Sequence, residues 1–198
     1  MNSLLNREQG KIELFKKYGY DIVKARKYIV AKAKFGVGRM LEVGTGRGYM
    51  TIALAQEGFR LTSIDVDRGA QKQAKENLKI NSFSKSAVFK IMNAERLRFP
   101  DNYFNSVISV NFIHHAQHPV RCVKEMVRVT KEKLVIADLN KRGERIMAKV
   151  HSLNGHRHHE SRMSLVLVRA LVKSLGMNVT MYHDRCQIVL VAKTGGTR

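Results

Sequence analysis

Three glycines at alternate positions, Gly44, Gly46 and Gly48, come directly after a short apolar run over residues 40–43. A helix-like pattern of apolar residues begins right after them, so this stretch predicts a strand, a sharp turn and a helix. Glycine suits such a turn because it adopts positive φ and because a ligand can lie against peptide that has no Cβ. The first N–H groups of the following helix favour a polar or anionic group nearby. The stretch therefore predicts a ligand-binding turn.

The spacing of these glycines separates two kinds of nucleotide-binding turn. A dinucleotide turn reads G-x-G-x-x-G, whereas here the third glycine comes one residue early and Tyr49 stands where that pattern has glycine. The stretch from Glu42 to Gly48 resembles motif I of the class I S-adenosyl-L-methionine (SAM)-dependent methyltransferases, E/D-x-G-x-G-x-G. The resemblance implies that SAM is the cofactor, that Glu42 supports its methionine end, and that the turn, including Thr45, faces methionine and ribose. Glycine-rich turns also have a purely structural role in other α/β proteins, so the residues further along the chain are needed to distinguish the two interpretations.

An acidic residue ends the next predicted strand, which covers residues 60–65. Asp65 lies about 20 residues beyond the first glycine, where nucleotide-binding α/β folds place a carboxylate that accepts both ribose hydroxyls. Two hydroxyl donors need one bidentate acceptor, and a carboxylate supplies it. Asp65 is therefore the predicted ribose ligand, and the resemblance adds Val66 beside it. Asp67 is predicted to cap the helix that follows.

Two further positions are assigned to the cofactor by the resemblance. Asn93 and Ala94 follow the third predicted strand, residues 87–92, where the family often has Asp-Ala with the acid contacting the adenine amino group. Here Asn93 replaces the acid, and its carbonyl oxygen is able to accept from the same amino group. Asn111 directly follows the fourth predicted strand, residues 106–110, and is assigned to the cofactor site as well.

A pair of histidines, His114 and His115, lies just beyond that fourth strand, at the carboxyl end of the sheet where ligands of such folds bind. The stretch over residues 111–119 resembles the x-x-L-H-H-x-x-D/N-P segment of small-molecule methyltransferases. It does not match the N-P-P-Y motif of enzymes that methylate exocyclic amines of adenine. His114 is the candidate for lining the acceptor pocket; the alternative is a packed histidine behind it.

The order of the predicted elements indicates one α/β domain. Two amphipathic helices occupy residues 5–34, a fifth strand covers residues 133–139, and a strongly apolar helix covers residues 164–175. Two adjacent strands at the end indicate an antiparallel hairpin. The resembled fold is a Rossmann-like, seven-stranded, mostly parallel sheet with helices on both faces and such a hairpin at its end. We expect an N-terminal helical cap (1–36), a SAM-binding core (37–139), an inserted lid-like loop (140–163), and the last helix with the hairpin (164–193).

Residues 140–163 differ in character from the core, being rich in basic residues, Gly, Asn and Ser. They contain His151, His156, His158 and His159, but no cysteine or suitably placed acid completes a metal set, so no metal is predicted. A loop or short helix over the cleft, touching substrate or nucleic acid, is the expectation.

The formal charge of +20 is the unusual bulk property of the 198 residues. Its excess lies in the flanks, with ten basic against three acidic residues over 1–39 and eleven against three over 141–198. Such a surface attracts phosphate polymers and anionic metabolites, and it also serves solubility. RNA binding through the basic flanks therefore stays open. We expect no membrane span and, from two cysteines without metal or redox spacing, a cytoplasmic protein. The sequence does not indicate an oligomeric state.

The function predicted from this pattern is methyl transfer from SAM to a small-molecule acceptor, in the manner of the "type 11" and ubiquinone/menaquinone-biosynthesis-like group. The leaving group is a neutral thioether, so most of the rate is available from holding nucleophile and methyl group about 3 Å apart in a dry cleft. Two alternatives are an rRNA or tRNA methyltransferase, suggested by the basic flanks, and a non-catalytic SAM-binding protein. A dehydrogenase is disfavoured by the misplaced third glycine.

Overall fold

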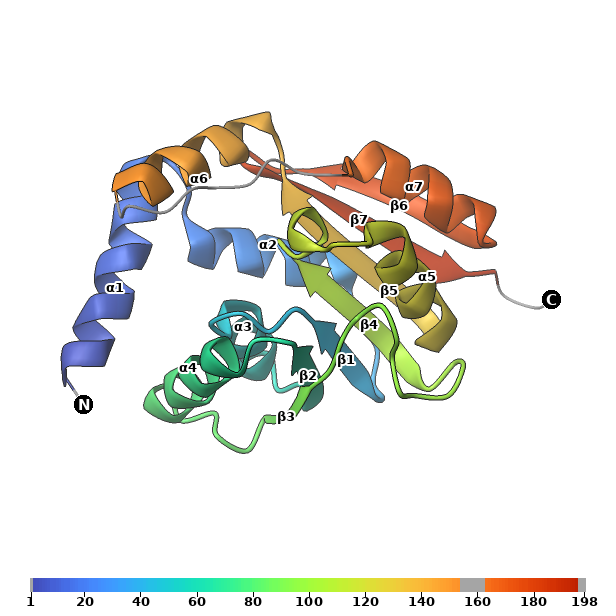
Figure 1. Ribbon diagram of the computed structural model, residues 1–198, viewed down its shortest axis with the longest axis horizontal. Helices are drawn as coiled ribbons and strands as arrows, with labels where there is room; N and C mark the ends of the chain where they lie inside the picture. Colours follow the sequence, from blue (N-terminus) through green and yellow to red (C-terminus); the bar gives the residue numbers. More distant parts are fainter. Residues whose placement is uncertain (1, 154–162, 196–198) are drawn as a thin grey trace.

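A seven-stranded sheet forms the centre of the part of the chain that the computed structural model describes, residues 2–153 and 163–195 (Figure 1). The strand order is β3-β2-β1-β4-β5-β7-β6. The parallel pairs are β3 with β2, β2 with β1, β1 with β4, and β4 with β5, whereas β7 pairs antiparallel with both β5 and β6. The strands are β1 (Met40–Val43), β2 (Leu61–Asp65), β3 (Ala87–Ile91), β4 (Phe104–Val110), β5 (Thr130–Leu139), β6 (Met177–His183) and β7 (Gln187–Thr194). The predicted fold class, including the closing hairpin, is confirmed.

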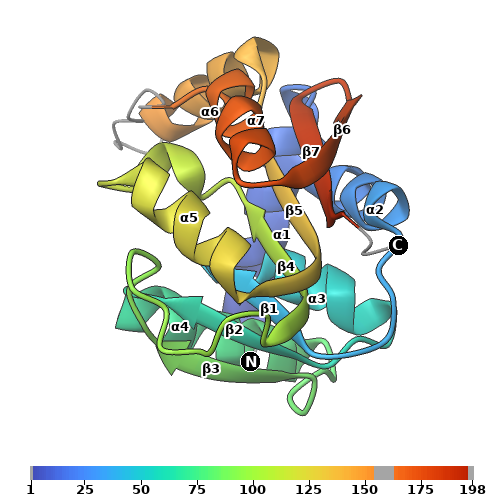
Figure 2. The same cartoon turned by 90° about the vertical axis from the view of Figure 1, so that its right-hand side faces the viewer.

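Helices cover both faces of this sheet, as Figure 2 shows, with α5 and α7 on one side and α2 and α3 on the other. The first two helices are separated at Gly19, which has φ +95°. The helices are α1 (Asn2–Lys17), α2 (Ile22–Ala33), α3 (Tyr49–Gln56), α4 (Arg68–Ile80), the short 3₁₀ turn η1 (Ile113–His115), α5 (Pro119–Val129), α6 (Lys141–Leu153) and α7 (Leu165–Ser174).

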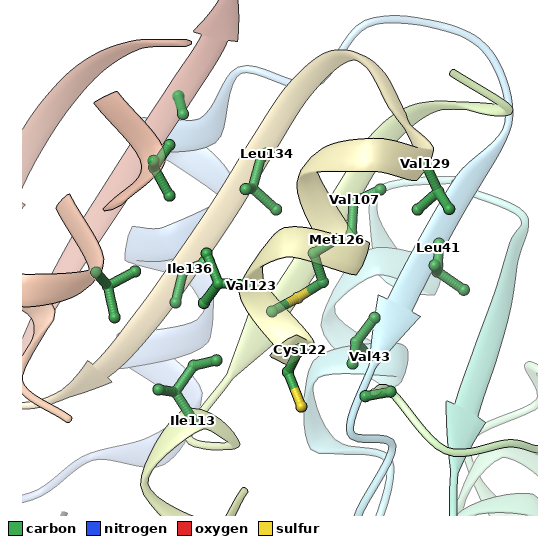
Figure 3. Close-up of a cluster of buried hydrophobic side chains, with 14 of the residues drawn as sticks. Leu41, Val43, Val107, Ile113, Cys122, Val123, Met126, Val129, Leu134 and Ile136 are labelled. Carbon is green, nitrogen blue, oxygen red and sulfur yellow. The ribbon is translucent and has the colours of Figure 1, made fainter. Parts of the chain in front are cut away.

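The two faces of the central strands bury different side chains because successive residues of a strand point to opposite sides. On one face, Val107 of β4 and Leu134 of β5 pack against Val123 and Met126 of α5 (Figure 3). On the other face, the neighbouring Ile108 and Val135 belong to a second cluster with residues of α2 and α3. All six side chains are fully buried. The central strands therefore read as continuous apolar runs, as a sheet covered on both sides requires.

The strand order reverses between β1 and β4, which places a crevice at the carboxyl ends of these two strands. The glycine turn follows β1, Asp65 ends β2, and Asn111 and His114 follow β4. The site residues predicted after a strand therefore all lie on the side of the sheet where the parallel strands have their carboxyl ends. The fold positions the site by this reversal.

Residues 141–153 form helix α6, which follows β5 directly and contacts α1. Of the two expectations for residues 140–163, a loop or a short helix, the structure shows a helix over this part. Residues 154–162, with His156, His158 and His159, lie outside the described residues. His151 is in α6, where its ring meets the edge of Phe15 at a centroid distance of 6.4 Å. The division of the chain into cap, core, lid and hairpin stays a prediction.

Candidate functional site

The glycine turn has the conformation that the sequence predicts. Gly44, Gly46 and Gly48 have φ of +86°, +50° and +80°. A Cβ on Gly44 would lie 2.8 Å from the Phe112 side chain, so glycine is required there on two grounds. At Gly46, no heavy atom lies within 4 Å of the place a Cβ would take. The turn therefore presents bare peptide to open space at Gly46, as a ligand-binding turn requires.

Asp65 lies against this turn. Its Oδ2 accepts from the Gly46 N–H at 2.8 Å and its Oδ1 from the Asp67 N–H at 3.0 Å. Each carboxylate oxygen keeps a second lone pair, so two hydroxyl donors still find acceptors. The predicted cap is confirmed as well, because Asp67 accepts from the Gly69 and Ala70 N–H groups at the start of α4.

A cavity of about 310 Å³ opens beside Asp65 at the carboxyl ends of β1 and β2. Its lining contains five of the residues predicted to bind the cofactor, Gly44, Asp65, Val66, Asn93 and Ala94, and also His115. Asn93 is exposed and its Oδ1 accepts from the Glu95 N–H at 2.8 Å, which fixes the side chain in a local turn. Ala94 is buried beneath. The structure therefore brings the predicted ribose and adenine residues to one cavity.

Glu42 lies fully buried in β1, in the midst of an otherwise apolar strand. Its Oε2 accepts from the Thr51 and Ser63 hydroxyls, each at 2.6 Å, while its Oε1 has no partner. Burial raises the pKa of Glu42 to about 7, although the two hydroxyl hydrogen bonds and the Arg26 charge oppose the shift. Thr45, also buried, shares a 2.6 Å hydrogen bond with the same Ser63 hydroxyl. The carboxyl group therefore holds one unused acceptor.

Two more buried polar atoms without a partner belong to Asn111, which follows β4, and to Arg26 of α2. Asn111 adopts φ +53° and its buried Oδ1 has no partner. Arg26 of α2 is 7% exposed, donates from Nη1 to the Tyr20 hydroxyl at 2.9 Å, and has no partner for Nε. The Tyr20 hydroxyl in turn lies 3.3 Å from Gln187 Oε1 and 3.5 Å from Asn111 Nδ2. Two free acceptors and one free cationic donor fit the ammonium and carboxylate groups of a bound amino acid.

Helix α1 is fastened to the glycine turn by one carboxylate. Glu8, 8% exposed, accepts from Gln73 Nε2 at 2.6 Å and from Arg47 Nη1 at 3.3 Å, and also from the Tyr49 hydroxyl. Burial is the largest cause that raises the pKa of Tyr49, followed by this contact with Glu8. The N-terminal helix thus reaches the turn itself, the start of α3 and the middle of α4.

His114 lies apart from the first cavity, in a second one. It is 5% exposed, and its Nδ1 lies 2.6 Å from Asp138 Oδ1, which also accepts from the Leu139 N–H at 2.9 Å. Both residues line a cavity of about 920 Å³ between the end of β5, α6 and α7. A carboxylate only accepts hydrogen bonds, so an ionised Asp138 selects the ring tautomer of His114 that carries its proton on Nδ1.

Sequence reasoning missed four residues of this arrangement: Tyr20, Arg26, Asp138 and Gln187. Tyr20 and Gln187 are recognised only through each other, at a separation of 167 residues, and Arg26 only through its contact with Tyr20. An acid at the end of β5 was the one available signal for Asp138. Among the described residues, no group of three metal-ligating side chains occurs, and no helix is long and apolar enough to cross a membrane.

Comparison with known proteins agrees with this geometry. Residues 41–136 match the family described as "Methyltransferase domain". The magnesium protoporphyrin IX methyltransferase of Synechocystis PCC 6803, solved with bound SAH, superposes with a TM-score of 0.67 over 94% of this chain and 87% of that one, at 15% identity. Residues 41–136 are thus similar to a methyltransferase domain, and the sheet order together with the superposition shows that the chain has the fold of this solved methyltransferase.

Two curated relatives are similar over about half of the chain. The phosphatidylethanolamine N-methyltransferase of Cereibacter sphaeroides is 30% identical over 95 residues, which are 48% of this chain and 46% of that protein. The 2-methyl-6-phytyl-1,4-hydroquinone methyltransferase of Synechocystis sp. is 34% identical over 109 residues, 54% of this chain and 33% of that protein. The chain thus spans less than half the length of these relatives.

Proposed function

We propose that the protein transfers the methyl group of SAM to a small-molecule acceptor. The observation that carries the proposal is the set of three unpartnered buried atoms, Glu42 Oε1, Asn111 Oδ1 and Arg26 Nε. Glu42 lies in the strand that leads into the glycine turn, and Arg26 and Asn111 both contact the Tyr20 hydroxyl. Unpaired buried polar atoms are costly and few in folded proteins, so these three indicate a ligand that pairs them. Relatives named for phospholipid and hydroquinone methylation support the choice of a small-molecule acceptor.

Different residues of the site would contact different parts of the cofactor. Asp65 would accept from the ribose hydroxyls, and Val66, Asn93 and Ala94 would flank adenine. Glu42 and Asn111 would accept from the methionine ammonium group, and the Arg26 guanidinium would face the carboxylate. When bound, SAM supplies an electrophilic methyl group with a neutral thioether as leaving group. The chain's own task is then to orient the acceptor and exclude water.

His114 is the residue we assign to the acceptor. Asp138 holds the proton on Nδ1 and fixes the ring plane, so that Nε2 serves as the base for an acceptor that must lose a proton. Asp138 acts through His114 and is a positioning residue. The second cavity, in which both lie, is the proposed acceptor pocket.

An RNA acceptor is not favoured, because both relatives above are named for small molecules. The test is transfer of labelled methyl groups from SAM into a cell extract, with and without prior ribonuclease treatment. We expect the label in a solvent-extractable fraction and no effect of ribonuclease. Label that disappears after ribonuclease would contradict the proposal, and so would SAM binding without turnover on any fraction.

Asp65→Asn tests the cofactor assignment separately. Removing a charged acceptor of two hydroxyl groups is expected to weaken S-adenosylhomocysteine binding in calorimetry by at least about tenfold, since hydrogen bonds to charged groups contribute about 1.5–3 kcal/mol. Asp67→Asn is the matched control, because Asp67 caps α4 and is absent from the cavity lining. Equal affinities for the two variants would remove Asp65 from the site.

We also propose a reducing, cytoplasmic setting. Free and buried thiols at Cys122 and Cys186 support it. Labelling of both thiols in freshly unfolded protein, without prior reductant, is the expected result.

A further inference from the structure

The 920 Å³ cavity that holds His114 combines two kinds of wall. Leu139, Leu165 and Ile188 line it with apolar surface. The first turn and a half of α6 lines it with cations, Lys141, Arg142 and Arg145, against a single acid, Glu144. The volume is at the upper end of the range for small-molecule sites, about 300–1,000 Å³. The cavity therefore has room for a molecule that carries both an apolar group and a charged group.

The three cations stand at an unfavourable place for the helix that carries them. Positive charges at a helix N-terminus oppose the helix dipole, and anions are favoured there. None of the three makes an ion pair with another residue in the described ranges, and all three are exposed. The Asn140 side chain caps the helix by accepting from the Arg142 and Gly143 N–H groups at 3.0 Å. An anion at this rim would consequently be held by the charged side chains, since the cap occupies those two amides.

The apolar wall continues to the outside of the protein. Val166, next to the buried Leu165 on α7, lines the cavity and is 68% exposed, and Leu167 beside it is 58% exposed. Isolated apolar residues on a surface are ordinary, but here they adjoin the apolar lining of a cavity. The cavity thus opens along an apolar strip that would cover a hydrocarbon or ring system.

The distance between the rim and the reacting end is short. Lys141 follows Asp138 by three residues, so their Cα atoms lie at most about 11 Å apart even in a fully extended chain. A molecule that places its nucleophile at His114 therefore reaches the cations with a spacer of small-molecule length.

We propose that the methyl acceptor is an amphipathic anion: an apolar body that lies along Leu165 and Val166, carrying a carboxylate or phosphate group held by Lys141 and Arg145. This rests on the proposed function, because it assigns the acceptor class of the same site. Neutral and cationic acceptors of equal size are selected against, since they leave the rim cations without a counter-charge.

The test measures binding to the full chain in the presence of saturating S-adenosylhomocysteine. Four probes share an octyl chain and differ in head group: octanoate, octyl phosphate, octanol and octyltrimethylammonium, each kept below its micelle concentration. We expect both anions to bind about tenfold or more tightly than octanol, and the ammonium to bind least. Tighter binding of octyl phosphate than of octanoate assigns a phosphate head group, and the reverse order assigns a carboxylate.

The rim is tested with the double variant Lys141→Gln, Arg145→Gln. Its affinity for the anions is expected to fall about tenfold while octanol binding stays unchanged. Lys72→Gln, Lys79→Gln is the matched control, because these exposed lysines lie on α4, away from the cavity. Val166→Asn is expected to weaken all four probes by a similar factor, as loss of an apolar contact requires.

Each other outcome overturns the inference. Equal binding of octanoate and octanol, no binding of any probe, or equal losses in the rim variant and its control would show that the cavity does not select an amphipathic anion. S-adenosylhomocysteine binding in the same samples separates this failure from that of the proposed function. If the nucleoside binds and the anions do not, only the acceptor class is wrong.

Discussion

At the scale of single residues, Glu42 is the most informative side chain. A carboxyl oxygen without a partner at 1% exposure retains a desolvation cost of about 1–3 kcal/mol. Its Oε2 is fully engaged by two hydroxyls, so the unpaired oxygen is not a consequence of poor local packing. Folded proteins depart from local rules mainly where function requires it. The unpaired oxygen of Glu42 therefore supports its proposed role in cofactor binding.

The raised pKa of Glu42 gives a prediction for cofactor binding. If the ionised carboxylate accepts from the ligand's ammonium group, protonation competes with binding. With a pKa of about 7, Glu42 is about nine-tenths protonated at pH 6 and about nine-tenths ionised at pH 8. We therefore expect S-adenosylhomocysteine to bind about tenfold more tightly at pH 8 than at pH 6, measured by calorimetry. Glu42→Gln should bind more weakly and show no such dependence.

Stability should change with pH in the opposite direction. Because the folded-state pKa of Glu42 lies above its ordinary value of 4.5, the folded chain holds the Glu42 proton more tightly than the unfolded chain does. The contribution of Glu42 to the free energy of unfolding is therefore complete below pH 4.5 and decreases as pH rises toward 7. Thermal unfolding of Glu42→Gln, which has no proton to lose, should differ from that of the unsubstituted chain by an amount that changes across this window. If the difference in stability between the two proteins did not change with pH, Glu42 would not be the group that titrates in this window.

The His114–Asp138 pair makes a separate prediction. Asp138→Asn weakens the hydrogen bond that orients the His114 ring, and His114→Gln removes the proposed base. Both variants should lower kcat by about a hundredfold or more, the usual contribution of general base catalysis. S-adenosylhomocysteine affinity should stay within about twofold, because neither residue lines the cofactor cavity. His118→Gln, an exposed histidine at the start of α5, is the control. If the His114 and Asp138 variants lost S-adenosylhomocysteine affinity by as large a factor as they lost kcat, the two residues would have a structural role only.

At the scale of elements, α5 holds the segment that follows β3, whose first residues line the cavity beside Asp65. Arg128 donates to the Leu97 and Phe99 carbonyls at 2.9 Å and to the Asp101 and Glu125 carboxylates at 2.7 Å. The hydrogen bonds that this guanidinium donates to the Glu125 carboxylate are the largest cause that raises its pKa. One side chain thus ties the segment between β3 and β4 to the helix that follows β4.

Arg128→Lys should therefore destabilise the protein although it keeps the charge. A lysine cannot donate in several fixed directions at once. We expect a loss of about 2 kcal/mol, which is about 4–8 °C in Tm for a chain of this size, measured by calorimetry. Arg121→Lys, at an exposed position of the same helix with no ion pair among the described residues, is the control. Equal Tm values for the two variants would contradict the assignment.

The elements show why some of the site was predictable and some was not. The glycine turn and Asp65 were predictable from local sequence, because a strand, a turn and an acid at a fixed spacing are contained in about 25 residues. Arg26 and Tyr20 lie in an N-terminal segment where every residue also fits an amphipathic cover, and their meaning depends on β1, β4 and β7. Asp138 becomes a partner of His114 only because β4 and β5 pair in parallel register. Long-range pairing was the missing information.

At the scale of the whole molecule, the charge of +20 remains to be explained. The described cations divide into those with a structural partner, such as Arg128, and exposed ones, such as Lys141 and Arg145. A polymer that contacts 6–10 phosphates through such cations would lose about 10³–10⁵ in affinity between 50 and 200 mM salt, because counterions are released at each contact. A small acceptor with one or two charges releases far fewer.

The salt dependence of turnover therefore separates a small anionic acceptor from a nucleic acid. For the acceptor fraction identified by methyl labelling, we expect kcat/KM to fall by less than about tenfold between 50 and 200 mM potassium chloride. The variant Lys141→Gln, Arg145→Gln should lose most of this remaining dependence, and Lys72→Gln, Lys79→Gln should retain it, since only the first pair lines the cavity. A fall of a thousandfold or more, shared equally by both variants, would mean that the surface as a whole binds a polyanion and that α6 has no special role.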